Sequence, residues 1–564
     1  MTAADKAGPL FLGLDLSTQQ LKGVLISRDS VVVHEINILL DDEFPEYKTQ
    51  NGRHVAGECV TAPVLLWVEA IDRLMAKVGQ TGLAEQVQGI SGAAQQHGTV
   101  YWNAAGIQAV ERLDGKVPLV EQLADAFALA DSPIWEDSST HAQCEQLERA
   151  AGSAAHLAQL TGSAAYERFS GTQIAKIKQT QPAVWAAVAR VSLVSSFVAS
   201  VLAGRIAPID VGDAAGTNIY DIQNGVWARA LCDSIDPTLV GRLGADIVMA
   251  DAPVGTVAQY FAHRYGFRPD CTVVAFTGDN LSAYGGFESL FASAAHSPAI
   301  VSLGTSDTIL FPLSKYPYAG DAALIPPEHL GGHVLPHPTD RSRYIAMLCY
   351  KNGSLARDWV RRTAFGDDAL WSKYAEAALD VCPLAPRLFG FYYRQTEILP
   401  RAKGIHRFER IVDGDFQSVE RFEPAADACA IIESQILAMR ADYAHKSDTL
   451  PPAVAVTGGA SSNPALLSVI ANVFNVPVFA VGAQKGSGNT DVLNPAMPAY
   501  GGAVRALSHW RSIQNDAGRS SEGGYVLHQV CSPNPQTHAL YSQSLGNYEQ
   551  LRNQVSRNSN PEAS

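Results

Sequence analysis

The amino-terminal part of the chain places a short polar turn between two apolar segments. Residues 10–16 and 21–27 are mostly apolar, and the turn between them, 17–20, reads Ser-Thr-Gln-Gln. Two such segments around a polar turn predict a β-hairpin. The apolar segment at 31–40 predicts a third strand. Asp15 stands where the first strand emerges into the turn, although a hairpin needs no carboxylate there.

Asp15 has two interpretations. Together with the hydroxyl, amide and backbone N–H groups of the turn, its carboxylate could hold a metal ion and a phosphate. Alternatively, Asp15 and Ser17 hydrogen-bond only within their own turn, as such residues commonly do. The hairpin by itself leaves both interpretations open.

The pattern then changes period. A helical pattern covers 64–78, and strand-like segments follow at 87–98 and 100–103. Strands followed by helices are typical of an α/β domain. The segment 183–204 is apolar and nearly long enough to cross a bilayer, but Arg190 and four serines interrupt it. We therefore expect it to be a buried core helix.

Near Val273 the arrangement starts again. The segment 273–280 predicts a strand that ends in an acid, and 299–311 predicts a second hairpin around a Gly-Thr-Ser-Asp turn. A strand, helical patterns near 425–445, and the strand-turn-helix 453–474 follow, with a last helix at 538–555. Each half therefore reads as a mixed α/β unit opened by a hairpin whose turn could cradle phosphate.

Composition narrows the class of protein. At 564 residues the chain is too long for one hydrophobic core, so at least two large domains are expected. The net charge of −14 argues against general nucleic-acid binding, which needs a basic face. The eight cysteines form no C-x-x-C pair, which predicts reduced, scattered thiols in a cytoplasmic protein. We see no secretory signal and expect no membrane partner.

Polar residues follow two of the predicted strands. Asp279 and Asn280 end the strand at 273–280, where Asp279 could accept a proton from a substrate hydroxyl or could cap the next helix. Gln95, Gln96 and His97 end another strand, and such side chains suit a polyhydroxylated ligand whose hydroxyls must be matched one by one.

Two further motifs have both a structural and a functional interpretation. Arg168 follows Glu167, and such a neighbouring pair is more often a surface ion pair than a ligand site. In "TGGASSNP", Gly458 and Gly459 permit close approach of a ligand, while Asn463 and the proline after it form an ordinary helix start. Neither the P-loop pattern nor a G-x-G-x-x-G after the first strand occurs.

Taken in order, these motifs resemble the FGGY family of carbohydrate kinases over nearly the whole chain. The resemblance includes "GLDLSTQQLKG", "GISGAAQQHGTVYW", "DAAGTNIYDI", "FTGDNLSA", "SLGTSDT", "YKNGSLARDWV" and "VTGGASSNP". Each motif is modest, but their shared order is specific. "STQQ" and "QQHG" favour the branch that acts on D-xylulose over the glycerol and gluconate branches. Lys22 stands where many relatives have Arg.

The resemblance implies an α/β fold with two ribonuclease-H-like, actin-like ATPase domains around a central cleft. The implied sugar-binding domain spans 8–296, the ATP-binding domain 297–512, and an extension with one helix 513–564. The implied activity is phosphorylation of D-xylulose to D-xylulose 5-phosphate, by in-line transfer of the γ-phosphoryl group of MgATP. A kinase for another ketopentose or polyol, such as ribulose, and a non-kinase actin-like ATPase remain alternatives.

The resemblance also assigns roles to individual residues. Asp279 is implied as the general base, and Asp15 is implied to lie near Mg²⁺. The residues implied to bind the sugar are Gln96, His97, Arg168, Asp279 and Asn280. Those implied to bind ATP or its phosphates are Thr18, Gln19, Gly304, Thr305, Trp371, Gly459, Ala460 and Asn463. The expected partners are a small-molecule sugar and ATP, without nucleic acid, in a monomer or homodimer.

Overall fold

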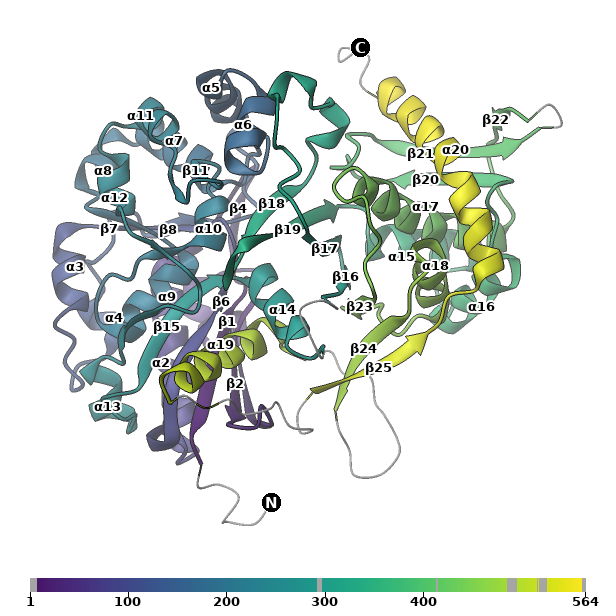
Figure 1. Ribbon diagram of the computed structural model, residues 1–564. Helices are drawn as coiled ribbons and strands as arrows, with labels where there is room; N and C mark the ends of the chain where they lie inside the picture. Colours follow the sequence, from purple (N-terminus) through teal and green to yellow (C-terminus); the bar gives the residue numbers. More distant parts are fainter. Residues whose placement is uncertain are drawn as a thin grey trace.

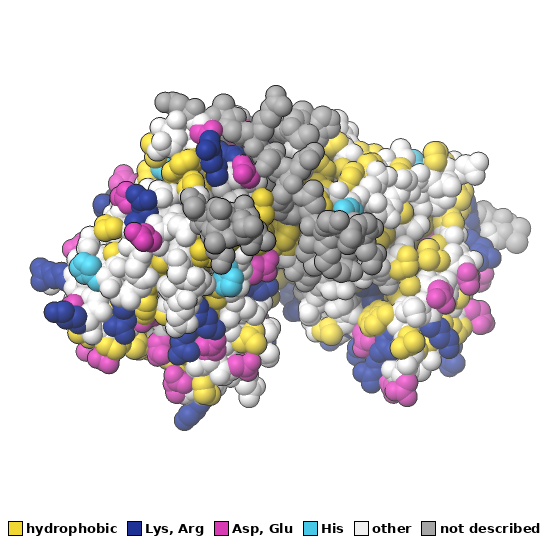
Figure 2. Space-filling model, turned by 90° about the horizontal axis from the view of Figure 1, so that it is seen from below, with side chains coloured by type: hydrophobic (Ala, Val, Ile, Leu, Met, Phe, Trp, Pro, Cys, Tyr) yellow, Lys and Arg dark blue, Asp and Glu magenta, His cyan; other side chains and the backbone are white. Residues whose placement is uncertain are grey.

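The chain forms two α/β lobes, each built around one large mixed sheet (Figure 1). The computed structural model describes residues 8–291, 297–411, 414–483, 495–514, 516 and 525–559. Seen in space-filling form, the lobes are separated by a notch, and acidic and basic side chains are interspersed over the visible face (Figure 2). The two-domain α/β architecture expected from the sequence is confirmed.

The first lobe contains a six-stranded sheet in the order β14-β15-β6-β1-β2-β3. Its strands are β1 (Leu10–Leu16), β2 (Gln20–Ser27), β3 (Val32–Leu39), β6 (Val87–Ala94), β14 (Pro253–Thr256) and β15 (Thr272–Gly278). The predicted hairpin and third strand are confirmed, since β1, β2 and β3 pair antiparallel in succession. On its other side β1 runs parallel to β6, and β6 runs parallel to β15.

The second lobe repeats this plan in a seven-stranded sheet with the order β18-β19-β17-β16-β23-β24-β25. Its strands are β16 (Ala299–Leu303), β17 (Asp307–Leu313), β18 (His333–His337), β19 (Asp340–Tyr350), β23 (Val454–Thr457), β24 (Val478–Ala483) and β25 (Tyr525–Cys531). Again an antiparallel hairpin, β16–β17, continues into parallel strands, β23 and β24. The predicted internal repeat is therefore confirmed.

Helices cover both faces of the first sheet. Leu12 and Leu14 of β1 share a core with α2 (Val64–Gln80) and α9 (Val194–Ala203), whereas Phe11 points to the other face, which α19 (Met497–Gln514) covers. The packing is close, because a Cβ added to Gly13 would lie 1.8 Å from the carbonyl oxygen of Ala499. The chain thus returns from the second lobe to complete the first.

The second lobe packs its sheet against a group of helices. These are α15 (Ser354–Phe365), α16 (Trp371–Val381), α17 (Pro424–Ala444), α18 (Pro464–Phe474) and α20 (Pro535–Ser559). The helices predicted at 425–445 and 538–555 are confirmed as α17 and α20, while β25, between α19 and α20, was not predicted. The domain limits given above remain predictions.

Shorter elements surround the two sheets. In the first lobe they are α1 (Leu40–Glu43), β4 (His54–Ala56), β5 (Cys59–Pro63), β7 (Thr99–Trp102), α3 (Ala104–Val110), α4 (Leu119–Gln122), β8 (Asp131–Pro133), α5 (His141–Ala151), α6 (Ala154–Thr161), α7 (Ser170–Thr180), β10 (Ile209–Asp210), α10 (Val211–Ala215), β11 (Tyr220–Asp221), β12 (Val226–Trp227), α11 (Arg229–Ile235), α12 (Leu239–Leu243), β13 (Ile247–Val248), α13 (Gln259–Tyr265) and α14 (Asp279–Glu288). In the second they are β20 (Leu388–Tyr393), β21 (Gly404–Arg410) and β22 (Phe416–Ser418).

The prediction of one buried helix over 183–204 is wrong. The segment forms α8 (Pro182–Ala187), then the strand β9 (Arg190–Leu193), then the wholly buried helix α9. β9 pairs with β7, so tertiary pairing overrides the continuous apolar pattern. No described helix is long and apolar enough to cross a bilayer.

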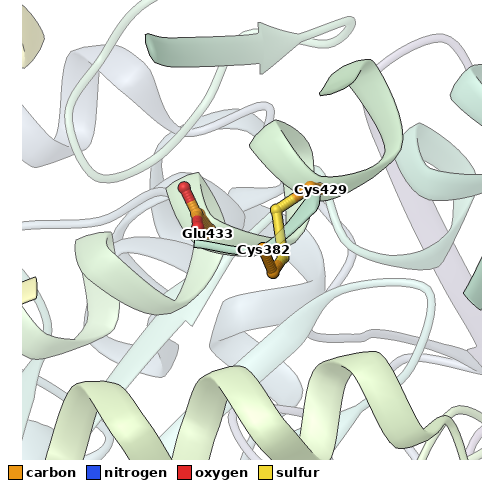
Figure 3. Close-up of side chains that lie close together, drawn as sticks. All are labelled: Cys382, Cys429 and Glu433. Carbon is orange, nitrogen blue, oxygen red and sulfur yellow. A yellow bond between two sulfur atoms is a disulfide. The ribbon is translucent and has the colours of Figure 1, made fainter. Parts of the chain in front are cut away.

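The prediction of eight reduced thiols is also wrong, because Cys382 and Cys429 form a disulfide (Figure 3). Glu433 lies beside the bond, one turn further along α17 from Cys429. Its carboxylate accepts hydrogen bonds from the backbone N–H of Leu384 at 2.8 Å and from the hydroxyl of Tyr541 at 2.8 Å. The cluster therefore joins α17 to the chain after α16 and to α20. Because the two sulfur atoms are bonded to each other and the carboxylate accepts hydrogen bonds, these atoms are not available to bind a metal ion.

Candidate functional site

The carboxyl ends of three parallel neighbours carry the candidate residues of the first lobe. Leu16 of β1 pairs with Ala94 of β6, and Ala94 pairs with Gly278 of β15. The residues directly before or after these positions are Asp15, the segment 95–97, and Asp279. Because the carboxyl ends of parallel strands share one edge of a sheet, strand pairing alone brings these groups together.

Asp15 is buried at this edge. Its side chain belongs to a residue that is 6% exposed, and Oδ1 has no hydrogen-bond partner among the described residues. Burial raises its pKa to about 7, and the charge of Asp279 adds to this, while Lys22 on β2 opposes it. The turn interpretation holds for Ser17, whose hydroxyl donates to the Gln20 carbonyl at 3.0 Å. It does not account for Asp15, because Oδ1 accepts no hydrogen bond from the turn.

Asp279 is the first residue of α14, directly after β15. The helix-cap interpretation is wrong, because Gly278 occupies the cap position. The Asp279 carboxylate instead accepts from the backbone N–H of Asn280 at 2.8 Å and from its amide at 3.0 Å. Burial raises the pKa of Asp279 to about 6, and the hydrogen bonds from Asn280 oppose this shift.

Asn280 links Asp279 to the end of β6. Its amide also donates to Oε1 of Gln96 at 3.0 Å, which leaves Nε2 of Gln96 buried without a partner among the described residues. The adjacent Gln95 has neither side-chain atom paired with a described residue. A carboxylate, an amide donor and an amide acceptor thus lie within one hydrogen-bonded row.

His97 has a fixed tautomer. Its φ of 71° lies in the left-handed region, and Nδ1 is 2.9 Å from the carbonyl oxygen of Gly216, which can only accept. Nδ1 therefore carries the proton. Burial, together with the charge of Arg168, lowers the pKa of His97 to about 3, so the ring is neutral and Nε2 is a hydrogen-bond acceptor.

Arg168 is buried, at 8% exposure, with its guanidinium 4.5 Å above the ring of Tyr166. The surface-pair interpretation is wrong, because Glu167 faces His141 at 3.5 Å instead. Arg168 makes no ion pair with the described residues, and its Nε has no hydrogen-bond partner among them. A buried guanidinium without a carboxylate is a strong donor available to a ligand.

Asp213 belongs to the same edge and was missed by the sequence reasoning. It lies on α10, is 2% exposed, and accepts a hydrogen bond from Ser195, while its Oδ1 has no partner among the described residues. Burial, followed by the charge of Asp210, raises the pKa of Asp213 well above its ordinary value. The motif "DAAGTNIYDI" contained it, but nothing in the spacing marked this acid over its neighbours.

In the second lobe, the turns after β16 and β23 lie side by side, because these strands are parallel neighbours. Gly304 and Thr305 form the first turn. In the second, Gly458 has a φ of 91°, and a Cβ there would lie 2.6 Å from the Leu303 carbonyl oxygen. Only glycine fits both the conformation and the contact.

Ala460 also reaches this turn, donating its backbone N–H to the Leu303 carbonyl at 3.3 Å. The next element begins as predicted: Asn463 caps α18, accepting from the backbone N–H groups of Ala465 and Leu466 at 3.0 and 3.2 Å. Gly459 faces open space, since an added Cβ would meet nothing within 4 Å. The proposed ATP residues of this loop therefore lie together next to Gly304.

A third element at this edge, the start of α15, was not assigned a role from the sequence. The backbone N–H of Ser354 donates to the Gly304 carbonyl at 2.9 Å, so the helix begins beside the turn. Beneath it, Arg357 contacts Asp307 through two hydrogen bonds of 2.5 and 3.0 Å, with both side chains 1% exposed. This buried pair fixes β17 to α15 and so holds the turn.

The remaining candidates are less closely joined. Thr18 accepts from the indole N–H of Trp135 at 2.9 Å, and Gln19 is exposed in the same turn. Trp371 is 44% exposed, stacks beneath Arg361 at 5.2 Å, and meets Tyr374 edge-on at 5.5 Å. Among the described residues, no recorded contact joins Trp371 to the loop at 458–463.

Comparison with known proteins agrees with this geometry. Residues 125–286 match the N-terminal domain of the FGGY family of carbohydrate kinases, and residues 299–488 match its C-terminal domain. A xylulose kinase of Rattus norvegicus is 37% identical over 558 residues, covering 98% of each chain.

Solved structures share the fold at much lower identity. A gluconate kinase and a ligand-bound xylulose kinase, both from Lactobacillus acidophilus, each superpose with a TM-score of 0.75 at 17% identity, covering 98% of this chain and 99% of theirs. The chain belongs to the FGGY family of carbohydrate kinases. The family resemblance and the actin-like fold inferred from the sequence are thereby confirmed.

Proposed function

We propose that this protein transfers the γ-phosphoryl group of MgATP to the C5 hydroxyl of D-xylulose. The observation that carries the proposal is the set of buried polar atoms without partners among the described residues at one edge of the first sheet, on Asp15, Gln95, Gln96, Arg168 and Asp213. Buried polar groups are normally paired, so their convergence beside Asp279 and His97 indicates a polyhydroxylated ligand. The 37% identity to a xylulose kinase over nearly the whole chain supports D-xylulose in particular.

In this reaction Asp279 receives the proton of the attacking hydroxyl. With a pKa of about 6, its carboxylate is ionised at neutral pH yet basic enough to accept a proton as the new bond forms. Asn280 orients the carboxylate through its two hydrogen bonds. The transition state of phosphoryl transfer is loose, so placing the hydroxyl in line with the phosphate contributes more than base strength.

The sugar hydroxyls are matched by groups of fixed polarity. His97 accepts through Nε2, Arg168 donates, and Gln96 donates through its unpartnered Nε2. A site built this way discriminates strongly against ligands that leave one of its buried polar groups unpaired.

The turns of the two lobes are suited to the phosphates. Backbone N–H groups at 304–305 and at 459 lie beside the amino ends of α15 and α18, where the helix dipoles favour negative charge. Asp15 fits Mg²⁺, because its Oδ1 is an unpaired, buried carboxylate oxygen next to a second carboxylate, Asp279. When bound, Mg²⁺ neutralises charge on the β- and γ-phosphates.

Two alternatives are separated by experiment. A kinase for another ketopentose or polyol would use the same residues, and a non-kinase ATPase would turn over ATP without sugar. We would identify the product after incubation with MgATP and, separately, D-xylulose, D-ribulose, L-ribulose, glycerol and gluconate, using ³¹P NMR and mass spectrometry. Formation of D-xylulose 5-phosphate at the highest kcat/KM supports the proposal, and preference for any other acceptor contradicts the substrate assignment. A cytoplasmic location and a monomeric or dimeric state remain predictions.

A further inference from the structure

His333 is a residue of the second lobe that contacts the sugar side of the first. It begins β18, yet its ring lies 4.9 Å from Phe169 and 6.3 Å from His97, both of the first lobe. The backbone ties the two parts together, since Val334 donates to the Gly162 carbonyl at 2.9 Å. No role was assigned to His333 from the sequence.

The ring is neutral and has one nitrogen engaged. Burial, followed by the charge of Arg168, lowers the pKa of His333 well below its ordinary value. Nδ1 is 3.3 Å from the hydroxyl of Ser163. Because a neutral imidazole has one donor and one acceptor nitrogen, the second nitrogen has its own hydrogen bond to make.

A cavity of about 640 Å³ opens between the lobes at this point, and His333 lines it. Tyr166 and Arg168 line it from the first lobe, and Cys349 of β19 lines it from the second. The buried guanidinium of Arg168, which forms no ion pair with the described residues, therefore shares this wall with His333. Both side chains are more than nine-tenths buried, so this wall of the cavity belongs to the protein interior and is not a shallow surface depression.

The position of His333 along the site gives it a specific task. Asp279, Asn280 and Gln96 form one hydrogen-bonded end, where the reacting hydroxyl must lie. His97, Phe169 and His333 follow in ring contact toward Arg168 and the cavity. A sugar with its C5 hydroxyl at Asp279 directs its carbonyl and C1 hydroxyl toward this second end.

We propose that His333 is a specificity-determining residue that hydrogen-bonds the carbonyl–hydroxymethyl end of the ketose together with Arg168. The inference rests on the proposed function, since it assumes a sugar oriented by Asp279. It adds that the second lobe, and not only the first, binds the acceptor and discriminates between acceptors. An acceptor bound this way links the two lobes, so recognition of the correct sugar also favours their closure.

The test compares acceptors that differ at that end. We would measure kcat and KM for D-xylulose, for 1-deoxy-D-xylulose, which lacks the C1 hydroxyl, and for xylitol, in which the carbonyl is reduced. The variants are His333→Ala and His333→Phe, of which the second keeps a ring against Phe169 and removes both nitrogens. His329→Ala, four residues upstream and stacked on His445, is the matched control.

Wild-type enzyme is expected to use D-xylulose about tenfold or more better than each analogue in kcat/KM, because a lost hydrogen bond in a desolvated site has about this effect. Either His333 variant should raise the KM for D-xylulose about tenfold and leave the KM for ATP within about twofold. It should also reduce the difference in kcat/KM between D-xylulose and at least one analogue. The His329→Ala control should keep the wild-type KM for D-xylulose, the wild-type KM for ATP and the wild-type difference in kcat/KM between acceptors.

A folded His333→Phe enzyme that keeps the wild-type KM for D-xylulose and the same gaps to both analogues would overturn the inference. Failure of the proposed function is a different result. If wild-type enzyme forms no D-xylulose phosphate at all, the proposed function fails first, and that outcome is seen before any variant is made.

Discussion

Asp279 raises the pKa of Asp15 across the carboxyl end of the first sheet, second only to the effect of burial. Asp15 lies on β1 and Asp279 directly follows β15; these two strands are far apart in sequence and separated in the sheet only by β6. Two neighbouring buried carboxylates without an intervening cation destabilise each other's ionised form. Their juxtaposition is the feature on which the proposed catalysis depends.

Replacing Asp279 tests its role as the base. Asp279→Asn keeps the shape of the side chain but removes the proton acceptor, so kcat should fall by about 10²- to 10⁴-fold. ATP binding, measured by calorimetry, should stay within a few-fold of wild type, because Asp279 belongs to none of the turns proposed to bind the phosphates. Asp233→Asn, at an exposed i,i+4 pair with Arg229, serves as the control. Turnover within a few-fold of wild type would contradict the assignment.

The pH profile of the wild-type enzyme follows from the same group. Asp279 must be ionised to accept a proton, and its pKa is about 6. We expect kcat/KM for the sugar to be constant above neutral pH and to fall about tenfold for each pH unit below about 6. Steady-state kinetics from pH 5 to 8 measure this, and a flat profile across that range would remove Asp279 as the group in control.

Asp15 is expected to contribute to function at the expense of stability. Its pKa is about 7 in the folded protein against an ordinary value of 3.8, so the folded state binds its proton more tightly than the unfolded chain does. The free energy of unfolding should therefore decrease as pH rises from about 4 to about 7, by up to about 1.4 kcal/mol for each unit.

Asp15→Asn removes this effect. The variant should unfold at higher urea concentration than wild type at pH 8 without Mg²⁺, with a difference on the order of 1–3 kcal/mol that shrinks toward pH 5. Its phosphoryl transfer should be lost. A variant less stable than wild type at pH 8 would show that the carboxylate is stabilised by contacts other than those described.

The buried pair of Asp307 and Arg357 holds the turn at 304–305, which we propose binds phosphate. Arg357→Met leaves the Asp307 carboxylate buried and unpaired, which should lower the free energy of unfolding by about 3–5 kcal/mol and raise the KM for ATP. The double variant Asp307→Leu/Arg357→Met should regain much of the stability, since no charge is then buried. Urea denaturation measures both, and an Arg357→Met enzyme as stable as wild type would show that the pair is solvated.

The disulfide between Cys382 and Cys429 closes a loop with a sequence separation of 47 residues. Reduction, or replacement of both cysteines by serine, should lower the free energy of unfolding by about 2–4 kcal/mol. Thermal unfolding with and without dithiothreitol measures the loss in wild type. The double serine variant should show no response to reductant, and a wild-type protein equally unresponsive would show that the bond does not form in solution.

Local sequence was sufficient where the site is made by strand ends. Asp15 lies near the end of an apolar strand, and Gln96, His97 and Asp279 each follow one, so parallel pairing places them together without further information. The turns at Gly304 and Gly458 could be predicted from the sequence because each also follows an apolar strand.

What could not be predicted depends on contacts between distant segments. His333 and Asp213 lie near the candidate site because of contacts with residues of other elements. No spacing in the sequence links either residue to the strand ends. The crossing of α19 to the first sheet, and the split of 183–204 into two helices and a strand, follow from pairing between remote elements. The disulfide joins two cysteines whose proximity only the fold creates.

The central claim is that ATP turnover depends on sugar. The measurement that tests it most directly is ADP release by the wild-type enzyme with MgATP, with and without D-xylulose, in a coupled assay. We predict release stimulated at least about a hundredfold by the sugar, because the hydroxyl must be placed at Asp279 and closure excludes water. Release that is equally fast without sugar would contradict the account and place the protein among actin-like ATPases of another kind.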